Sequence, residues 1–226
     1  MKCKGIIFDF NGTMYFDRDY NDEAWLKTIN SLADTKIEDL HAFTKGMKVY
    51  KDLQYVKGVM DKLGKSYDDK RLYEVSIAKE KLYQKIILEH HDNQLAPGLE
   101  ELLNQIKSLG IPYTIASMAP EINFDFYLDY LKLSRWFKKE EIIYDDFVTY
   151  DDKYQMYLDA AKLINLDLSD CLVFEDSPSG IKSATDAGCK NVIMIERPDN
   201  LKTENKAIVS LIKDYRNLNL KDYIEL

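Results

Sequence analysis

A short stretch near the start of the chain, Gly5–Thr13, combines residue types that can do chemistry. Apolar residues run without alternation into Asp9, a pattern typical of a buried parallel strand that ends at this aspartate. A carboxylate in such a position can serve as a nucleophile and as a metal ligand. Gly12 lets the backbone approach a ligand closely, and Thr13 offers a hydroxyl and a backbone N–H to an anion. A plain strand followed by an Asn-Gly turn is the alternative interpretation.

Two later strands are also predicted to end in polar residues. Ile111–Ser117 ends in a hydroxyl, and Cys171–Asp176 ends in two adjacent carboxylates. Ligands bind at the carboxyl ends of strands in open α/β sheets, so these side chains could share one crevice with Asp9. Carboxylates gathered in one cleft repel each other, and a divalent cation such as Mg²⁺ relieves that repulsion. The acidic pair could instead be favourable residues at the start of the helix that follows.

The elements that would position these side chains follow a change of composition at Ala96-Pro97-Gly98. The predicted strands are Ile111–Ser117, Ile142–Tyr144, Cys171–Asp176 and Asn191–Ile195, and the predicted helices are Leu99–Leu109, Pro120–Leu133, Tyr154–Ile164, Pro178–Ala187 and Asn205–Asp214. Strands that alternate with helices indicate βαβ units and a parallel sheet. We therefore expect a Rossmann-like α/β core, a parallel sheet flanked by helices, formed by residues 1–15 and 94–226.

Residues 16–93 contain helical patterns and no convincing strand, so we expect them to form an inserted all-helical cap domain. Asp69–His90 is the clearest helix, and Tyr20–Leu32 is another. In Asp69–His90, apolar residues recur at spacings of three and four and predict one buried stripe: Val75, Ala78, Leu82 and Ile86. We expect the cap to close over the crevice, which would exclude water and complete the substrate pocket.

The stretch Asp9-Phe10-Asn11-Gly12-Thr13 resembles the first motif of the haloacid dehalogenase superfamily, Asp-x-Asp-Gly-Thr, with Asn11 as the one departure. The remaining motifs of that family follow in order, a strand-end hydroxyl, a lysine and an acidic pair, here Ser117, Lys153, Glu175 and Asp176. The stretches Leu172–Ala187 and Pro97–Leu103 are similar to the β-phosphoglucomutase-like branch. Several motifs in order are far more specific than one, and the resemblance covers nearly the whole chain.

The resemblance implies that Asp9 attacks phosphorus and becomes an aspartyl phosphate. It also implies a Mg²⁺ cofactor held by four residues, namely Asp9, Asn11, Glu175 and Asp176. Asn11 would contribute its backbone carbonyl, as the residue two after the nucleophile does in this family, and an Asn can do this as well as an Asp.

By the same resemblance, three residues would bind the substrate phosphate, namely Thr13, Ser117 and Lys153. Ser117 would donate a hydrogen bond to the transferring phosphoryl group, and it could also cap the helix that follows. Lys153 would neutralise the phosphoryl oxygens and the nucleophile. The family usually follows this lysine with a proline-containing stretch, which here is shorter by about two residues, so a solvated surface lysine is the alternative.

Asn11 stands where phosphatases and mutases of this kind carry an acid. In those enzymes the second Asp of the motif protonates the leaving oxygen and later activates water. An amide can do neither at neutral pH, so this catalytic position predicts slow turnover. The sequence supports the architecture of a phosphoryl site more firmly than it supports fast catalysis.

The bulk composition narrows the class of protein. The chain has 226 residues, a net charge of −8 and 46% hydrophobic residues, which favours a soluble globular protein and disfavours a nucleic-acid partner. No apolar run approaches the ~20 residues of a membrane span, and no signal-peptide pattern is present. Cys3, Cys171 and Cys189 have no metal-site spacing and suggest reduced thiols. We expect a cytoplasmic monomer.

The expected function is a Mg²⁺-dependent phosphohydrolase that acts on a small phosphorylated metabolite through an aspartyl phosphate, slowed by Asn11. One alternative is a β-phosphoglucomutase-like sugar phosphomutase, in which Lys45 and Lys48 could contact a second phosphate, although solvated helix lysines are the simpler interpretation. The other is a catalytically impaired protein that binds a phosphate ligand or has a regulatory role.

Overall fold

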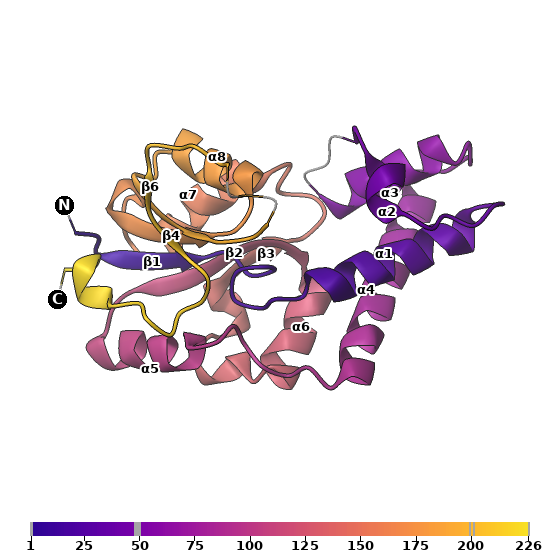
Figure 1. Ribbon diagram of the computed structural model, residues 1–226. Helices are drawn as coiled ribbons and strands as arrows, with labels where there is room; N and C mark the ends of the chain where they lie inside the picture. The colour runs from indigo at the N-terminus through magenta and orange to yellow at the C-terminus, as the bar shows by residue number, and fades with distance from the viewer. Residues whose placement is uncertain (1, 48–50, 199, 201, 226) are drawn as a thin grey trace. The chain divides into compact units, whose positions relative to one another are not determined.

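The structure, a computed structural model, describes residues 2–47, 51–198, 200 and 202–225 (Figure 1). The chain divides into two compact units. The first, the α/β unit, combines Met1–Phe16 with Gln94–Leu226, and the second, the helical unit, is the continuous segment Asp17–Asn93. The roles of these blocks as hydrolase core and cap remain predictions.

The α/β unit contains a six-stranded sheet in which all neighbouring strands are parallel. In spatial order the strands are β3 (Ile142–Asp145), β2 (Tyr113–Pro120), β1 (Gly5–Phe8), β4 (Cys171–Glu175), β5 (Asn191–Ile195) and β6 (Ile208–Ile212). The chain builds outward from β1 to β3 on one side and from β4 to β6 on the other. The winding reverses between β1 and β4, and the strand ends at such a switch point form the ligand crevice of open α/β sheets. The predicted Rossmann-like parallel sheet is confirmed.

Helices cover both faces of this sheet (Figure 1). α5 (Leu99–Leu109) and α6 (Glu121–Tyr130) lie on one face, and α7 (Lys153–Leu163) and α8 (Pro178–Asp186) lie on the other. The described residues of the unit also form short 3-10 helices, namely η1 (Leu133–Arg135), η2 (Lys139–Glu141), η3 (Leu168–Asp170) and η4 (Leu220–Asp222). The α-helices α5 to α8 begin and end close to the predicted residues, except that α6 stops at Tyr130 and not at Leu133.

The start of α8 shows how local sequence places the polar residues at the sheet edge. The Ser177 hydroxyl oxygen accepts a hydrogen bond from the Gly180 N–H at 3.0 Å, and Pro178 occupies the first turn. Both are favourable at a helix start, because the first N–H groups lack partners within the helix and proline has no N–H to leave unpaired. The helix therefore begins directly after β4, and the intervening carboxylates stay at the strand end.

Successive side chains of β1 and β4 pack on opposite faces of the sheet, as strand geometry requires. Ile7 and Val173 pack into a buried cluster with residues of α7 and α8. The next residues along each strand, Phe8 and Phe174, stack with ring centroids 4.9 Å apart, and Tyr215 packs against both rings. Burial on both faces fixes the register of β1 against β4, because a slip of one residue would exchange the two faces.

The predicted helix Asn205–Asp214 is wrong, because this segment forms strand β6, parallel to β5 at the edge of the sheet. Its exposure alternates with a period of two, and Val209 and Leu211 are each 45% exposed. Alternating exposure is the pattern of a strand with one partly solvated face, and the β-branched residues Ile208, Val209 and Ile212 favour a strand.

The helical unit consists of α1 (Arg18–Leu32), α2 (Leu40–Thr44), α3 (Asp52–Lys62) and α4 (Asp69–His90). Within its described residues, 17–47 and 51–93, no strand is present. Its own buried cluster brings Trp25 and Ile29 of α1 together with Val56 and Val59 of α3 and Leu72 of α4. Lys48, one of the lysines considered for a second phosphate, lies outside the described residues.

The buried face of α4 differs from the predicted stripe. Val75 and Ile86 are buried, but Ala78 is exposed. Its place on the buried face is taken by Lys79 and Glu80, which are 3% and 1% exposed. Apolar periodicity missed this face because two charged side chains bury themselves as a partnered pair.

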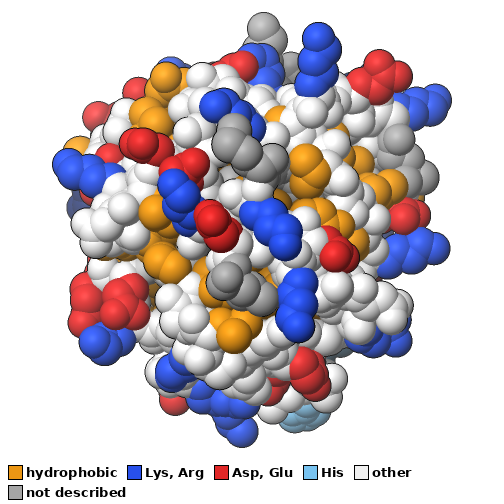
Figure 2. All heavy atoms as spheres, turned by 90° about the vertical axis from the view of Figure 1, so that its left-hand side faces the viewer, with side chains coloured by type: hydrophobic (Ala, Val, Ile, Leu, Met, Phe, Trp, Pro, Cys, Tyr) orange, Lys and Arg blue, Asp and Glu red, His pale blue; other side chains and the backbone are white. Residues whose placement is uncertain are grey.

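No helix in the described part of the chain is long and apolar enough to cross a membrane. Figure 2 shows the face where the strands of the α/β unit begin, with basic side chains interspersed among acidic and apolar ones. Asp9, Glu175 and Asp176 lie at the opposite edge of the sheet, where its strands end.

Candidate active site

Three carboxylates meet at the switch point of the sheet. Asp9 directly follows β1, Glu175 ends β4, and Asp176 follows it. All three are buried, and each offers an oxygen within 4.8 Å of the oxygens of the other two. The strand register causes this, because Phe8 lies beside Phe174 and the Asp9 N–H donates to the Phe174 carbonyl at 2.9 Å.

Lys153, the first residue of α7, reaches into this cluster. Its ammonium forms an ion pair with Asp9 Oδ1 and lies 2.7 Å from Glu175 Oε2. The helix start is fixed by Asp152, whose side chain accepts a hydrogen bond from the Tyr154 N–H at 2.8 Å. The structure therefore brings Lys153 to the acidic cluster, although the stretch after this lysine is shorter than in the family. A role in binding phosphate remains a prediction.

Burial and neighbouring charges shift the pKa values of the groups in this cluster. Burial and the neighbouring charge of Glu175 raise the pKa of Asp9 to about 6, against the opposing effect of Lys153 and of a hydrogen bond from the Thr13 hydroxyl. Burial would lower the pKa of Lys153, but the charges of Asp9 and Glu175 outweigh it and hold that pKa above its usual value. Lys153 is thus a fixed cation beside a carboxylate that is costly to keep ionised.

Glu175 is saturated with hydrogen-bond donors. Its Oε2 accepts from Lys153 and, at 2.5 Å, from the Tyr157 hydroxyl. Its Oε1 accepts from the N–H groups of Asp176 and Ser177 and from the Ser177 hydroxyl. Burial alone would raise the pKa of Glu175, but Lys153 and these donors bring it below the usual value. Glu175 therefore anchors Lys153 and the start of α8, and its predicted role as a metal ligand would require it to exchange donors.

Two glycines make room for these carboxylates. A Cβ atom at Gly180 would collide with the carboxylate of Glu175, and a Cβ at Gly12 would collide with that of Asp176. Gly12 also has a φ of +77°, in the left-handed region that other residues rarely adopt. The loop after β1 can therefore pack directly on Asp176 only because residue 12 has no side chain.

The donor set of the cluster fits a hard divalent cation. Oδ2 of Asp176 is buried and accepts no hydrogen bond among the described residues, although the guanidinium of Arg197 forms an ion pair with it. Asp9 and Asp176 supply carboxylate oxygens close to one another, and Mg²⁺ takes oxygen ligands of this kind, usually one or two carboxylates. These two side chains are the better candidates for direct ligands, since Glu175 already has its donors.

Asn11 lies on the turn after β1 and is directed to α6. Its amide nitrogen donates to the Tyr127 hydroxyl at 3.2 Å. The turn is closed by the Phe10 carbonyl, which accepts from three N–H groups, those of Thr13, Met14 and Tyr15. The Asn11 side chain is thus held by the Tyr127 hydroxyl. The backbone carbonyl of Asn11 remains a predicted metal ligand.

Thr13 and Ser117 use their hydrogen-bonding groups within the protein. The Thr13 hydroxyl donates to Asp9 Oδ2 at 2.9 Å, and its N–H donates to the Phe10 carbonyl at 3.2 Å. The Ser117 hydroxyl oxygen accepts from the Ala119 N–H at 3.1 Å. Thr13 lies on the turn after β1 and Ser117 lies on β2, and both residues are buried. Binding a phosphate would require Thr13 to redirect a donor, whereas Ser117 could still donate its O–H, because its oxygen only accepts in the bond to Ala119. Both roles stay predictions.

Comparison with known proteins identifies the family. The model of the haloacid dehalogenase-like hydrolases matches residues 3–188 of the chain. The chain belongs to the haloacid dehalogenase-like hydrolases. The family predicted from the motifs is confirmed, and the protein is an enzyme of the hydrolase class.

Relatives of this hydrolase include phosphatases and a mutase. It is 25% identical over 225 residues to the phosphorylated carbohydrates phosphatase of Thermotoga maritima, covering 96% of this chain and 97% of that one. It is 24% identical over 197 residues to the β-phosphoglucomutase of Bacillus subtilis, covering 82% and 80% of the two chains. The crystal structure of a family IA variant 3 hydrolase from Entamoeba histolytica superposes with a TM-score of 0.84 at 27% identity and covers 98% of this chain and 97% of that chain.

The hydrolase also contains site residues that sequence reasoning missed. Tyr157 contacts Glu175, and its position four residues after Lys153 on α7 could have placed it on the same helix face. Arg197 follows the end of β5, a strand-end position like that of Asp9. Asn200 and Tyr127 gave no signal in the sequence, because their partners are a backbone carbonyl and the Asn11 side chain.

Proposed function

We propose that this hydrolase is a Mg²⁺-dependent phosphohydrolase that acts on a small phosphorylated metabolite through an aspartyl phosphate. The observation that carries the proposal is the setting of Asp9, whose Oδ1 pairs with Lys153 and whose Oδ2 accepts from Thr13, beside the second carboxylate Asp176. A carboxylate that is buried, oriented at both oxygens and faced by a fixed cation suits nucleophilic attack on an anionic phosphate.

In the proposed reaction a carboxylate oxygen of Asp9 forms a bond to phosphorus, and the bond from phosphorus to the leaving oxygen breaks. Lys153 neutralises charge on the nucleophile before attack and on the phosphoryl oxygens during it. Glu175 holds the Lys153 ammonium in place, and the Tyr157 hydroxyl in turn donates to Glu175. Water then attacks phosphorus, the bond from phosphorus to the Asp9 oxygen breaks, and inorganic phosphate leaves as the carboxylate is restored. A divalent cation bound by Asp9 and Asp176 would neutralise phosphate charge and orient the substrate.

Asn11 determines which substrates react. Its amide cannot protonate a leaving alkoxide or activate water, and it is held by the Tyr127 hydroxyl. Acyl and aryl phosphates have leaving groups that need no proton, so they should react best, and the aspartyl phosphate should accumulate because its hydrolysis is slow. Restoring the acid with Asn11→Asp should raise turnover of alkyl phosphates by about 10²–10⁴-fold.

The test is a turnover panel of acetyl phosphate, p-nitrophenyl phosphate and sugar phosphates, run with Mg²⁺ on the wild-type protein and on Asn11→Asp. Peptide mass spectrometry of the Asn11 segment must accompany it, because Asn-Gly sequences deamidate and would produce the acid during storage. If intact Asn11 protein hydrolyses sugar phosphates as fast as the Asp variant, another residue supplies the proton and the proposal for this site is wrong.

We further propose that residues 16–93 act as a cap over the crevice. The helical unit is inserted between β1 and β2, directly after the catalytic turn, and it has its own core. A cap would exclude water and add substrate contacts. Hydrogen exchange with and without inorganic phosphate plus Mg²⁺ tests this, since closure predicts slower exchange in segments of both units.

The relative named as a β-phosphoglucomutase supports a second candidate, a sugar phosphomutase. An assay for sugar-phosphate isomerisation in the presence of a sugar bisphosphate separates it from the phosphatase. A protein that binds phosphate ligands without turnover is the third possibility that Asn11 allows. It would show ligand-induced thermal shifts and no product across the same panel.

A further inference from the structure

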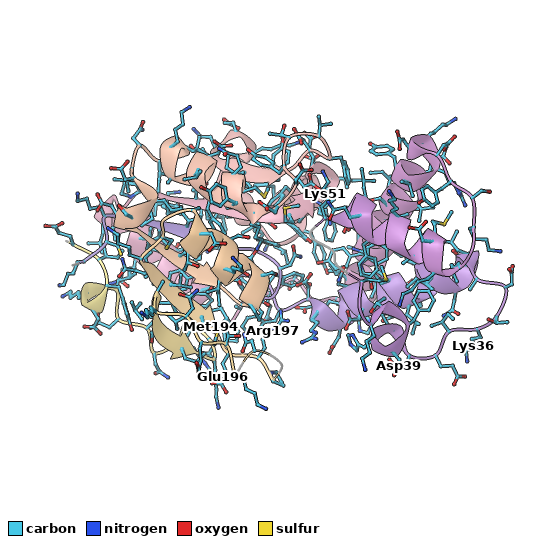
Figure 3. The ribbon with its side chains drawn as sticks, turned by 90° about the horizontal axis from the view of Figure 1, so that it is seen from above. Lys36, Asp39, Lys51, Met194, Glu196 and Arg197 are labelled. Atoms are coloured by element: carbon cyan, nitrogen blue, oxygen red, sulfur yellow. The ribbon has the colours of Figure 1, made fainter. Side chains whose placement is uncertain are left out.

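Arg197 is a basic residue that faces the metal-ligand candidate Asp176. It lies just past the end of β5, close to Met194 and Glu196 along the chain (Figure 3). Its guanidinium forms an ion pair with Oδ2 of Asp176. The Asp176 side chain is 3% exposed and that of Arg197 is 24% exposed, so the cation reaches a buried carboxylate from the surface.

A buried asparagine, Asn200, links the backbone segments that carry Arg197 and Asp176. The Asn200 amide nitrogen donates to the backbone carbonyls of Asp176 and Ile195, at 2.6 and 2.7 Å. Its side-chain oxygen accepts from the Arg197 N–H at 2.9 Å. Asn200 is 1% exposed, so the three bonds are shielded from water. The backbone that carries Arg197 is thereby tied to the backbone that carries Asp176, and the ion pair is a built feature of the fold.

The carboxylates of the cluster differ in how their charge is compensated. Glu175 has five donors and Asp9 has Lys153 and Thr13, whereas Oδ2 of Asp176 accepts no hydrogen bond among the described residues. The interaction that the structure shows at this oxygen is the ion pair with Arg197. A buried carboxylate without such a cation would be costly, so Arg197 stabilises the metal-free site.

Little room remains at Oδ2 for a second cation. A Cβ atom added to Gly12 would lie 3.0 Å from Nη1 of Arg197, so the guanidinium packs against the turn after β1 as well as against the carboxylate. A divalent cation held by Asp9 and Asp176 would need an oxygen of the same Asp176 carboxylate. Guanidinium and metal ion are thus alternative counter-ions for one carboxylate.

We infer that Arg197 competes with the divalent cation for Asp176 and so sets the cation concentration at which the site fills. The inference rests on the proposed metal site of Asp9 and Asp176. Arg197 touches no reacting atom in this scheme and acts through Asp176. When the ion pair is formed in most molecules, the apparent affinity for the cation falls by the fraction of molecules in which Asp176 is available.

The test is calorimetric titration of Mg²⁺ into metal-free wild-type protein, Arg197→Gln, Arg197→Lys, Asp176→Asn and Arg216→Gln. Arg216 is a matched control, because it also lies in the α/β unit and pairs with an aspartate, Asp214, at the surface. We expect Arg197→Gln to lower the Mg²⁺ dissociation constant about ten-fold. Arg197→Lys should lie between Gln and wild type, and Arg216→Gln should leave the constant unchanged.

Thermal denaturation of the same proteins gives a second readout. Arg197→Gln should lower the metal-free melting temperature and enlarge the rise caused by saturating Mg²⁺. If Arg197→Gln does not fold, Arg197→Lys carries both measurements. Unchanged or weaker Mg²⁺ binding in the Arg197 variants, with binding lost in Asp176→Asn, overturns the competition and leaves the metal site intact. Unchanged binding in Asp176→Asn overturns the metal site and the inference together.

Discussion

The α/β unit and the helical unit each contain a lysine that pairs with a buried carboxylate, and the two lysines differ in their surroundings. Lys79 on α4 donates hydrogen bonds to Glu80 at 2.9 Å and to Asn21 at 2.7 Å. Its ammonium also lies over the rings of Trp25 and Tyr83, 4.7 and 5.3 Å from their centroids. Burial would lower the pKa of Lys79, but the charge and hydrogen bond of Glu80 together with the charges of Asp52 and Asp17 outweigh this effect, and the net shift is upward. One cation contacts one carboxylate, and aromatic rings complete the shell.

Lys153 has two carboxylates as direct partners. It contacts Asp9 and Glu175, and Asp176 completes a group of three carboxylates that faces two cations, Lys153 and Arg197. The group gathers three carboxylate oxygens within 4.8 Å of one another. Lys79 instead forms its ion pair with Glu80, and the charges of Asp52 and Asp17 also act on it. A buried ion pair alone therefore does not indicate a site. Carboxylate oxygens this close together do, because one bound cation would balance them.

The largest effect should come from Asp9→Asn, which removes the proposed nucleophile. We expect kcat/KM on p-nitrophenyl phosphate to fall by roughly 10⁴–10⁶-fold. The metal-free fold should not be weakened, because burial and Glu175 already disfavour the Asp9 carboxylate. Steady-state kinetics with chemical denaturation checks both. Asp170→Asn, at a partly exposed carboxylate of the same unit, is the control, and activity retained in Asp9→Asn would contradict the assignment.

The next effect should be structural and confined to the helical unit. Lys79→Met leaves Glu80 buried without its cation, which should lower the free energy of unfolding by roughly 3–5 kcal/mol. Saturating Mg²⁺ should not restore this loss. Denaturant unfolding with and without Mg²⁺ measures it, with Lys81→Met at an exposed position of α4 as control. A loss below about 1 kcal/mol would show that the pair is not structurally important.

Lys153→Met sharpens the comparison, because the same chemical change should have a different outcome. Turnover should fall by roughly 10²–10³-fold, since the phosphoryl charge loses a preorganised cation. The metal-free protein should also lose stability, and here Mg²⁺ should restore part of it by replacing the missing charge. The exposed Lys162 of the same helix, changed to Met, is the control. If Mg²⁺ restores neither lysine variant, charge balance does not separate the two regions.

The smallest effect should come from Tyr157→Phe. Glu175 loses one of its donors and keeps four, so the free energy of unfolding should fall by about 1 kcal/mol. Turnover should fall less than ten-fold, because Lys153 keeps its contact with Asp9. Tyr154→Phe, at a 41% exposed position of α7, serves as control. A turnover loss as large as that of Lys153→Met would mean that the Tyr157 hydroxyl does more than hold Glu175.

The parts of the site that the sequence predicted are those set by strand ends. Asp9, Glu175 and Asp176 follow apolar strands, and parallel pairing brings such positions together whatever the rest of the chain does. Lys153 was predicted by family resemblance, since its approach depends on how α7 packs. Arg197 was missed because its partner lies on another strand and nothing local marks the pair.

The same contrast holds for the fold. α4 was predicted from Asp69 to His90 with the observed bounds, yet its buried face was predicted wrongly at Ala78. Long helices follow from local pattern, whereas the burial of Lys79 depends on partners in α1 that periodicity does not reveal. β6 was predicted as a helix because an edge strand of alternating exposure is defined by pairing with β5, a contact between segments that are not adjacent.

The insertion of the helical unit between β1 and β2 has a consequence for synthesis of the chain. β1 is made first, but its partners β2 and β4 begin only at Tyr113 and Cys171. The helical unit is continuous from Asp17 to Asn93, so it can fold on the ribosome before the partner strands of β1 have been synthesised. Pairing of distant parallel strands is slow, because a long loop must close before contacts form. The apolar residues before Asp9 therefore lack their partner strands for most of synthesis, and we expect them to be the segment of the nascent chain that a chaperone protects.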